Sequence, residues 1–198
     1  MLTVEQLKYI EQTPNENDIS LRLLAIFYEK YISNRIYELE MENDTILVFT
    51  TKNQHFPHLI GLHKFYDRNH TNKLLHSKKQ LKSDKGFNNL KNSKITFQDL
   101  KNIAGSTKRY NNYKKRILNF PFTYQLLRKS KFISYDKEKV NNNTKIPGNY
   151  VFVNNIGTNK LHFFFIDETN NIIDDGITNE NKDYSVVSLL LLYAFIIF

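Results

Sequence analysis

Three of the chain's six histidines lie within nine positions, at His55, His58 and His63 of the stretch HFPHLIGLHKF. Imidazole titrates near neutral pH and can act as a general acid, a general base or a metal ligand. Helical metal ligands that converge stand three or four residues apart, whereas His58 and His63 are separated by about 140° around a helix axis. No acidic residue accompanies them as in H-E-x-x-H. The spacing therefore argues against a metal site, and we predict no metal and no other cofactor.

The same stretch has the groups needed to move protons near a phosphate. Lys64 follows His63, and Asp67 lies one helical turn beyond, where a carboxylate can fix an imidazole tautomer. If a helix continued unbroken through Gly61, only one of His58 and His63 could face the site. The alternative is an amphipathic helix start in which the histidines have no chemical role. The residues alone leave both interpretations open.

The net charge of +8 is strongly segregated along the chain. Residues 1–50 carry 4 basic and 9 acidic side chains, residues 51–160 carry 23 and 5, and residues 161–198 carry 1 and 6. A concentrated basic centre repels itself unless a polyanion neutralises it, and nucleic acid is the commonest such partner. The alternative is a bias toward lysine and asparagine codons, which raises the charge without implying a ligand. The clustering favours a polyanion site.

Hydrophobic periodicity predicts the elements that would position these groups. Residues 18–42 show apolar steps of three and four and predict one helix, and residues 44–52, DTILVFTTK, predict a strand. Pro57 suits the first turn of the next helix. Further on, ITFQDLKNIAG has Thr96 and Asp99 spaced as a capping box, although its first residues are also strand-like.

The second half of the chain predicts two more helices and then strands. Residues 110–136 read as two helical stretches broken at Pro121. Residues 149–155 and 161–168 are aromatic and β-branched, and the asparagine- and glycine-containing link between them predicts a β-hairpin. Residues 170–178 are a further strand candidate.

Composition indicates one domain over residues 1–198, with a polar insertion near 67–94 and an apolar segment at 186–198. The chain has no cysteine, which excludes disulfides and thiolate zinc sites, and its first residues do not resemble a signal peptide. We therefore expect a cytoplasmic protein. As a helix the apolar segment would span about 20 Å, short of the ~30 Å bilayer core, so membrane association is not expected. A buried helix or strand is the first interpretation, and a partner-docking tail or anchor the second.

The order of FTTK, HFPHLIGLHKF, KITFQDLKN, YKKRILNFPFTYQLL, IPGNYVFVNN and LHFFFIDE, over roughly residues 45–170, resembles a family of phage-associated domains. That family belongs to the barnase, EndoU, colicin and RelE-like (BECR) nucleases, and its most specific element here is H-L-x-G-L-H-K. The resemblance implies an α+β fold with amino-terminal helices packed on a curved antiparallel sheet. It also implies a metal-independent ribonuclease. The match ends near residue 170.

The resemblance implies an endoribonuclease toxin of a phage-related or defence locus, which cleaves tRNA or mRNA through the 2′-hydroxyl. An antitoxin protein or RNA would restrain it. On this reading the general acid and base are His58 and His63, with His162 as a lesser candidate, while Lys64 and Arg116 bind phosphate.

Aromatic side chains alternate with basic ones over residues 108–124, a pattern typical of surfaces that stack bases and bind phosphates. The predicted RNA-binding residues are Lys108, Arg109, Tyr113, Lys115 and Tyr124. Tyr110, Phe120 and Phe122 belong to the same strip, although the core competes for the phenylalanines. The alternatives to an enzyme are a non-catalytic RNA- or DNA-binding module and an interaction protein that docks through its apolar tail.

Overall fold

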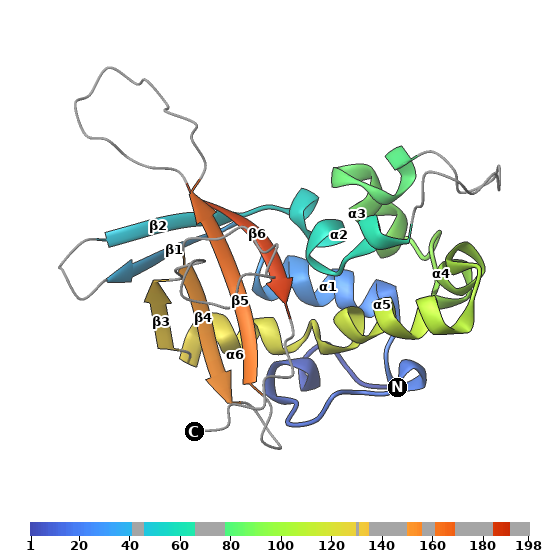
Figure 1. Cartoon of the computed structure of the whole chain (residues 1–198), viewed down its shortest axis with the longest axis horizontal. Helices are drawn as coiled ribbons and strands as arrows, with labels where there is room; N and C mark the ends of the chain where they lie inside the picture. Colours follow the sequence, from blue (N-terminus) through green and yellow to red (C-terminus); the bar gives the residue numbers. More distant parts are fainter. Residues whose placement is uncertain are drawn as a thin grey trace.

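A computed structural model describes the main chain of residues 1–40, 46–65, 78–129, 131–134, 150–155, 161–168 and 184–190. Side chains are described within 1–38, 48–65 and 80–128. Over this part of the chain the fold is α+β (Figure 1). Its helices are α1 (Leu21–Tyr31), α2 (Phe56–Leu59), α3 (Ser83–Lys91), α4 (Phe97–Ala104), α5 (Thr107–Asn119) and α6 (Phe122–Lys129). Its strands are β1 (Arg35–Glu40), β2 (Ile46–Thr51), β3 (Lys131–Ser134), β4 (Tyr150–Asn155), β5 (Leu161–Glu168) and β6 (Tyr184–Leu190).

Short 3₁₀ turns complete the described elements: η1 (Gln6–Tyr9), η2 (Glu16–Asp18), η3 (Asn53–His55), η4 (Leu62–Lys64) and η5 (Lys78–Leu81). The strands form one sheet in the order β1-β2-β6-β5-β4-β3. All neighbouring pairs are antiparallel except β2 and β6, which run parallel. The sheet is therefore mixed, and the expectation of a wholly antiparallel sheet is wrong at this one pair. The predicted hairpin of β4 and β5 is confirmed.

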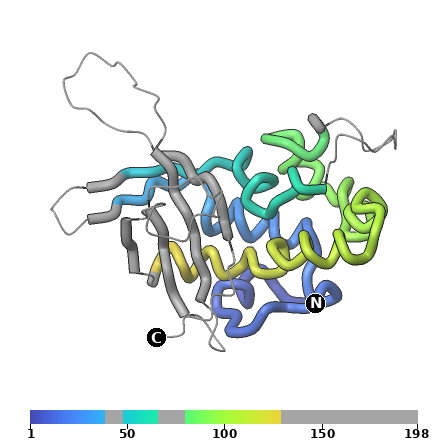
Figure 2. The backbone as a smooth tube through the Cα atoms, in the orientation of Figure 1, coloured from blue at the N-terminus to red at the C-terminus, as the bar shows by residue number. Residues whose placement is uncertain are grey.

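The helices gather beside the sheet, and α6 lies against β4 and β5 (Figure 1). In Figure 2 the backbone of α5 and α6 crosses the molecule along nearly one line. Helix α1 lies at the centre of the core, with Leu24, Phe27 and Tyr28 fully buried. The Tyr28 ring stacks on Phe56 at 5.1 Å between centroids, and Phe120 packs edge-on against Phe56 at 5.0 Å. This aromatic group fastens α2 and the α5–α6 junction to α1.

The predicted helix over residues 18–42 is corrected. Helix α1 begins after Ser20, whose hydroxyl accepts a hydrogen bond from the amide of Leu23, and it ends at Tyr31. Asn34 then adopts a left-handed conformation with φ of 56°, and residues 35–40 pair with β2 instead. Ile36, expected on the buried stripe, is 68% exposed. Pairing with β2, the strand that follows directly in the chain, thus overrides the local helical periodicity.

Three predicted helix starts and ends are confirmed. Pro57 lies in the first turn of α2, where its missing amide donor costs nothing. Thr96 and Asp99 form a reciprocal capping box at the start of α4. The break at Pro121 separates α5 from α6. The second predicted helical stretch is corrected at its end, because α6 stops at Lys129 and residues 131–134 form β3, which pairs with β4.

The expected polar insertion is partly a core helix. Residues 83–91 form α3, whose Phe87 and Leu90 are buried, and Phe87 packs edge-on against Phe56 at 6.1 Å. Residues 66–77 lie outside the described part. The first residues of the apolar segment belong to β6, while residues 191–198 and the strand candidate at 170–178 also lie outside it. Among the described residues, no helix is both long enough and apolar enough to cross a bilayer.

Candidate functional site

The stretch HFPHLIGLHKF folds as two short helical pieces joined at a glycine. Helix α2 ends at Leu59, Gly61 takes a left-handed conformation with φ of 78°, and the turn η4 follows. The apolar side chains of the stretch are all fully buried: Phe56, Leu59, Ile60, Leu62 and Phe65. Burial of these five anchors both pieces to the core and leaves the polar side chains on the remaining face.

The turn at Gly61 brings His58 and His63 together. Their rings are stacked, with centroids 4.5 Å apart and planes inclined by 17°. His58 is exposed, and His63 is half-buried with a buried Nδ1 that has no hydrogen-bond partner among the described residues. The 140° separation expected for a continuous helix therefore does not apply, because the helix does not continue through Gly61.

Burial and surrounding positive charge make His63 hard to protonate. Its partial burial is the main cause, followed by His58, Arg116, Lys64 and Lys82, and together they lower the pKa of His63 to about 4. The pKa of Lys64 is also lowered, by burial and by Arg116. His63 is thus a neutral imidazole at pH 7, held within a group of cations.

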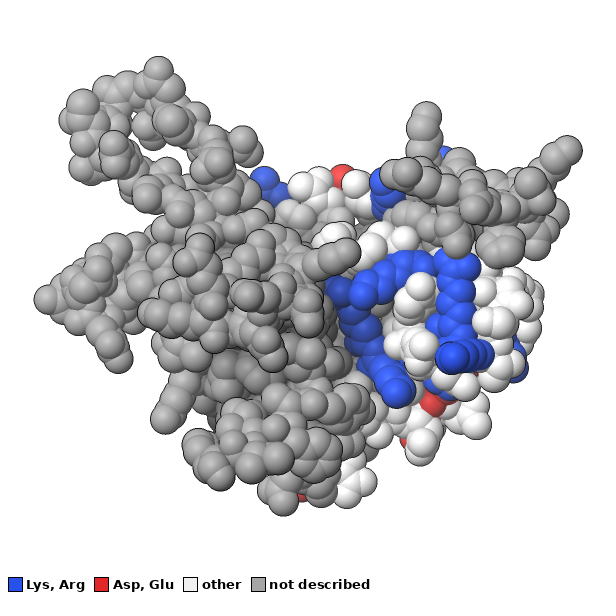
Figure 3. Space-filling model, viewed as in Figure 1, with Lys and Arg blue, Asp and Glu red and all other residues white. Residues whose placement is uncertain are grey.

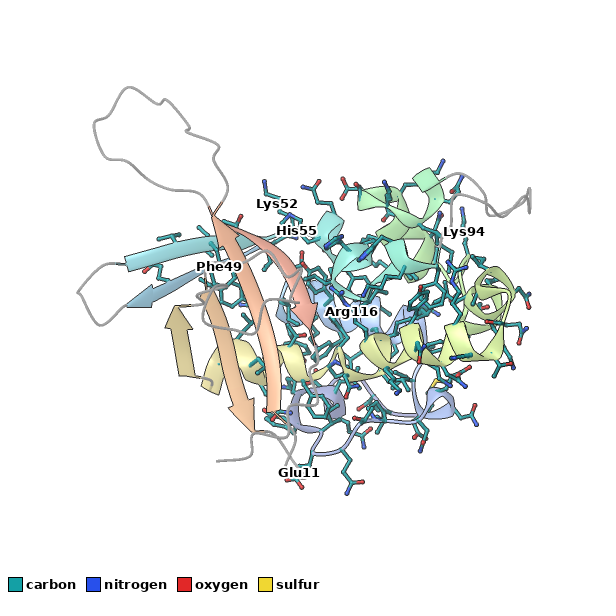
Figure 4. The ribbon with its side chains drawn as sticks, in the orientation of Figure 1. Glu11, Phe49, Lys52, His55, Lys94 and Arg116 are labelled. Carbon is teal, nitrogen blue, oxygen red and sulfur yellow. The ribbon has the colours of Figure 1, made fainter. Side chains whose placement is uncertain are left out.

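Arg116 on α5 holds the backbone of the histidine turn. Its Nε donates to the carbonyl of Leu59 at 2.7 Å, and its Nη2 donates to the carbonyl of His58 at 3.3 Å. A Cβ on Gly61 would lie only 2.9 Å from Arg116 Cδ, so the glycine supplies both the positive φ and the space. Figure 4 shows Arg116 between α2 and α5. Burial lowers the pKa of Arg116 to about 10. Arg116, which the sequence predicted to bind phosphate, thus donates its hydrogen bonds to main-chain carbonyls in this structure.

Two predicted RNA-binding residues share this face of α5 with Arg116. Arg109 Nη2 donates to the carbonyl of Lys64 at 3.3 Å, and the ring of Tyr113 packs edge-on against Phe65 at 5.4 Å. The guanidinium of Arg109 lies 5.6 Å from the centre of the Tyr113 ring. Residues 109, 113 and 116 recur at helical spacing, so one stripe of α5 supports the whole histidine turn.

The other predicted site residues are placed elsewhere. Lys108 and Lys115 are exposed on α5. Tyr124 lies on α6, where its ring packs edge-on against Tyr31 at 5.6 Å. The remaining aromatic residues of the strip are buried: Tyr110, Phe120 and Phe122. His162 lies on β5 opposite Asn154, and its side chain is outside the described part, as is Asp67.

Sequence reasoning missed one cation of this site. Lys82 joins η5 to α3, and it is among the charges that act on His63. The sequence shows that Lys82 belongs to the basic central segment, residues 51–160, but no helical or strand spacing relates it to His63. On the face viewed in Figure 3, lysine and arginine side chains gather over the region of α2 and α5.

Among the described side chains, no three histidine, cysteine, aspartate or glutamate residues are grouped so as to hold a metal ion. No family model, no curated protein and no solved structure matches the chain. The site is therefore interpreted from its own geometry: a stacked imidazole pair beside Lys64, with Arg116 beneath it.

Proposed function

We propose that the chain is a metal-independent endoribonuclease of the BECR type, with its helices packed on the sheet as in that family. It would act in the cytoplasm as the toxin of a phage-related or defence locus, cleave tRNA or mRNA, and be restrained by an antitoxin protein or RNA. The observation that carries the proposal is the stacked pair of His58 and His63 among cations. Two imidazoles and fixed positive charge are what phosphodiester transfer through the 2′-hydroxyl requires.

In the proposed reaction, neutral His63 accepts the proton of the 2′-hydroxyl. The 2′-oxygen bonds to phosphorus, the bond from phosphorus to the 5′-oxygen breaks, and a 2′,3′-cyclic phosphate forms. His58 donates a proton to the departing 5′-oxygen. Lys64 stabilises the charge that develops on the phosphate oxygens, and Arg116 adds to the field while holding the turn.

The environment of His63 supports its assignment as the base. Because its pKa lies well below 7, the free site presents an imidazole with an available lone pair. A phosphate bound beside it offsets the positive field and raises the pKa toward the operating pH, where a general base is most effective.

The test is cleavage of an oligoribonucleotide in EDTA by the parent chain and by His63→Gln and His58→Gln. General acid or base groups contribute about 10²- to 10⁴-fold to rate, so each variant should lose activity on that scale. Affinity for a 2′-deoxy analogue and the melting temperature should stay near those of the parent. His55→Gln is the matched control: His55 lies in the same stretch, and its Nδ1 accepts a local hydrogen bond from the Lys52 amide.

Equal cleavage by all three variants and the parent would remove the histidine pair from the mechanism. Absence of cleavage by the parent, combined with salt-dependent binding of RNA, would identify the non-catalytic binding module instead. For the toxin role, expression of the parent chain should arrest growth, and His63→Gln should relieve that arrest. Growth arrest that persists unchanged in His63→Gln would separate any toxicity from cleavage.

A further inference from the structure

Helix α5 uses three of its five basic side chains within the fold, and it has no acidic residue. Its two arginines donate hydrogen bonds to main-chain carbonyls of the histidine turn, and Lys114 forms an ion pair with Glu16 at 3.0 Å. The other two basic residues, Lys108 and Lys115, are exposed. Within the described part of the chain, no hydrogen bond or ion pair involves their side chains.

Lys108 and Lys115 belong to one stripe of exposed polar side chains on α5, which also contains Asn111 and Asn112. Spacings of three, four and seven residues place all four on one face of the helix. The two lysines lie about 10 Å apart along the helix axis, at 1.5 Å per residue, with the two amides between them. We call these four residues the lysine–asparagine stripe.

The lysine–asparagine stripe lies beside the face of α5 that supports the histidine turn. At about 100° per residue, its centre is about 120° around the helix axis from residues 109, 113 and 116. Those three residues contact the turn, and buried Tyr110 and Ile117 hold the helix in the core in this orientation. A nucleic acid strand with a phosphate at the histidine pair thus has a second basic face next to it on α5.

The aromatic side chains near the stripe are packed against the protein. Tyr110 is buried, half-buried Tyr113 packs edge-on against Phe65, and Tyr124 of α6 packs edge-on against Tyr31. The stripe itself consists of ammonium and amide groups, with no ring on which a base could stack. Proteins bind single strands largely by stacking bases on aromatic side chains, whereas they bind double-stranded RNA through its phosphates and 2′-hydroxyls. The exposed chemistry of α5 therefore favours a double-stranded ligand.

The charge around the stripe also favours a polyanion. No acidic residue lies between Asp99 and Asp136, an interval that contains nine basic residues. Asp99 is bound in the capping box of α4, and Glu16 pairs with Lys114 on another side of α5. A phosphate at the stripe would meet no carboxylate of α5 itself, and the counterions that it releases would add to the affinity.

We propose that the lysine–asparagine stripe binds the sugar–phosphate backbone of a double-stranded RNA segment, next to the strand held at the histidine turn. In this complex Lys108 and Lys115 bind phosphates, and the amides of Asn111 and Asn112 donate hydrogen bonds to phosphate or ribose oxygens. The inference rests on the proposed function for its choice of RNA. It adds the class of substrate: an RNA in which a stem adjoins the cleaved phosphate, and not an unstructured single strand.

The probe is a short RNA duplex with a 2′-O-methyl group on every ribose, which stays in the A-form and cannot be cut through the 2′-hydroxyl. The reference ligand is a single strand of the same length and modification. Fluorescence anisotropy over a range of salt concentrations measures the affinity of the full chain for both. The parent should bind the duplex more tightly than the single strand, and its affinity should fall steeply as the salt concentration rises.

Variants of the stripe locate the duplex. Lys108→Gln and Lys115→Gln should each weaken duplex binding by about threefold and reduce the slope of log affinity against log salt by about one. The double variant should lose about tenfold, because the two positions act independently. Asn111→Asp keeps the shape of the side chain but places a negative charge within the stripe, so it should weaken binding at least as much as either lysine variant.

Helix α3 supplies a matched control. Lys85 and Asn88 are exposed there at the same three-residue spacing as Lys108 and Asn111. Lys85→Gln and Asn88→Asp make the same chemical changes and should alter duplex affinity by less than about twofold at 0.15 M salt, where charges outside the contact are screened. The melting temperatures of all these variants should stay near that of the parent, because the positions are exposed.

Three results would overturn the inference: no binding of the duplex, equal affinity for the single strand, or equal losses in the α5 and α3 variants. Each applies whether or not the chain cleaves RNA, because the probe cannot be cut. Conversely, duplex binding that depends on the stripe, in a chain that never cleaves RNA, would support the stripe as an RNA-binding surface and contradict the nuclease.

Discussion

Two basic clusters in the described part of the chain have pKa shifts of opposite sign: the pKa values of the lysines are raised in the first, and those of His63 and Lys64 are lowered in the second. At the first, the carboxylate of Glu5 accepts hydrogen bonds from Lys8 and Lys30, each at 2.7 Å, and from the hydroxyl of Tyr31. Hydrogen bonds from the lysines lower the pKa of Glu5 to about 2, and Glu5 raises the pKa values of both lysines. At the histidine pair, burial and neighbouring cations lower the pKa values of His63 and Lys64 instead.

The two clusters are also held in the fold by different contacts. The Glu5 cluster joins the segment before η1 to the end of α1, and its charges satisfy one another within the fold. The histidine cluster is held by buried apolar side chains and by a hydrogen bond from Arg116 to the main-chain carbonyl of Leu59. The predictions below test this contrast, beginning with the largest effect.

Arg116→Ala should destabilise the chain most. It removes a part-buried hydrogen bond to the Leu59 carbonyl and an exposed one to the His58 carbonyl, and an acceptor that loses its partner away from water costs about 1–3 kcal/mol. Denaturant unfolding should show that loss in the free energy of unfolding. Lys115→Ala, on an exposed face of the same helix, should stay within about 0.5 kcal/mol of the parent. Equal stability of both variants would mean that Arg116 does not hold the turn.

Gly61→Ala and Gly105→Ala compare two left-handed glycines, with φ of 78° and 70°. Each should cost about 1–2 kcal/mol, because a Cβ is unfavourable in this conformation. Only Gly61→Ala should also displace Arg116 and shift the NMR titration midpoint of His63. An unchanged midpoint in Gly61→Ala would show that the histidine geometry does not depend on this turn.

The pH dependence of stability should identify His63 itself. Its pKa is lowered from 6.5 to about 4 on folding, so the unfolded chain binds more protons between these values. The contribution of this group is fully present above about pH 6.5 and is lost as the pH falls toward 4. Denaturant unfolding of His63→Gln should show a shallower decline over this window than the parent. Parallel curves would exclude a lowered His63 pKa.

Glu5→Gln should have the smallest effect, because the cluster is exposed and surface ion pairs contribute little. The lowered pKa of Glu5 gives a contribution that is present above about pH 4.5 and is lost as the pH falls toward 2. The parent and variant should therefore differ slightly at neutral pH and converge in acid. The NMR titration midpoint of His63 should be unchanged in this variant, since Glu5 is not among the groups that shift the pKa of His63.

Local signals in the sequence predicted the local structure well. Pro57, the pair of Thr96 and Asp99, and Pro121 each act within one helical turn, and each has the predicted role in the structure. The failure at residues 35–40 has the opposite cause. Ile36 continues a helical pattern, yet its backbone pairs with Thr50 of β2, and such pairing is set by residues beyond the periodicity window.

The residues of the candidate site could be identified from the sequence, but their arrangement in space could not. HFPHLIGLHKF identified the histidines and Lys64, but the 140° objection assumed a helix through Gly61. Glycine is the residue that takes positive φ without strain, so it was the available sign of a turn. Arg116 was assigned to phosphate from its charge alone. Its bonds to two carbonyls depend on how α5 meets α2, which no spacing in the sequence records.

The parallel pairing of β2 with β6 has a consequence for the order of folding. Phe49 lies opposite Tyr184, so one side of the β1–β2 hairpin can be completed only after most of the intervening chain has been made and closed into a very long loop. Loop closure of this kind slows folding. Until β6 arrives, the inner edge of β2 presents unpaired amides and carbonyls, which are a template for pairing with other chains. During synthesis this edge is where a chaperone, or a second nascent copy, would compete with the native strand.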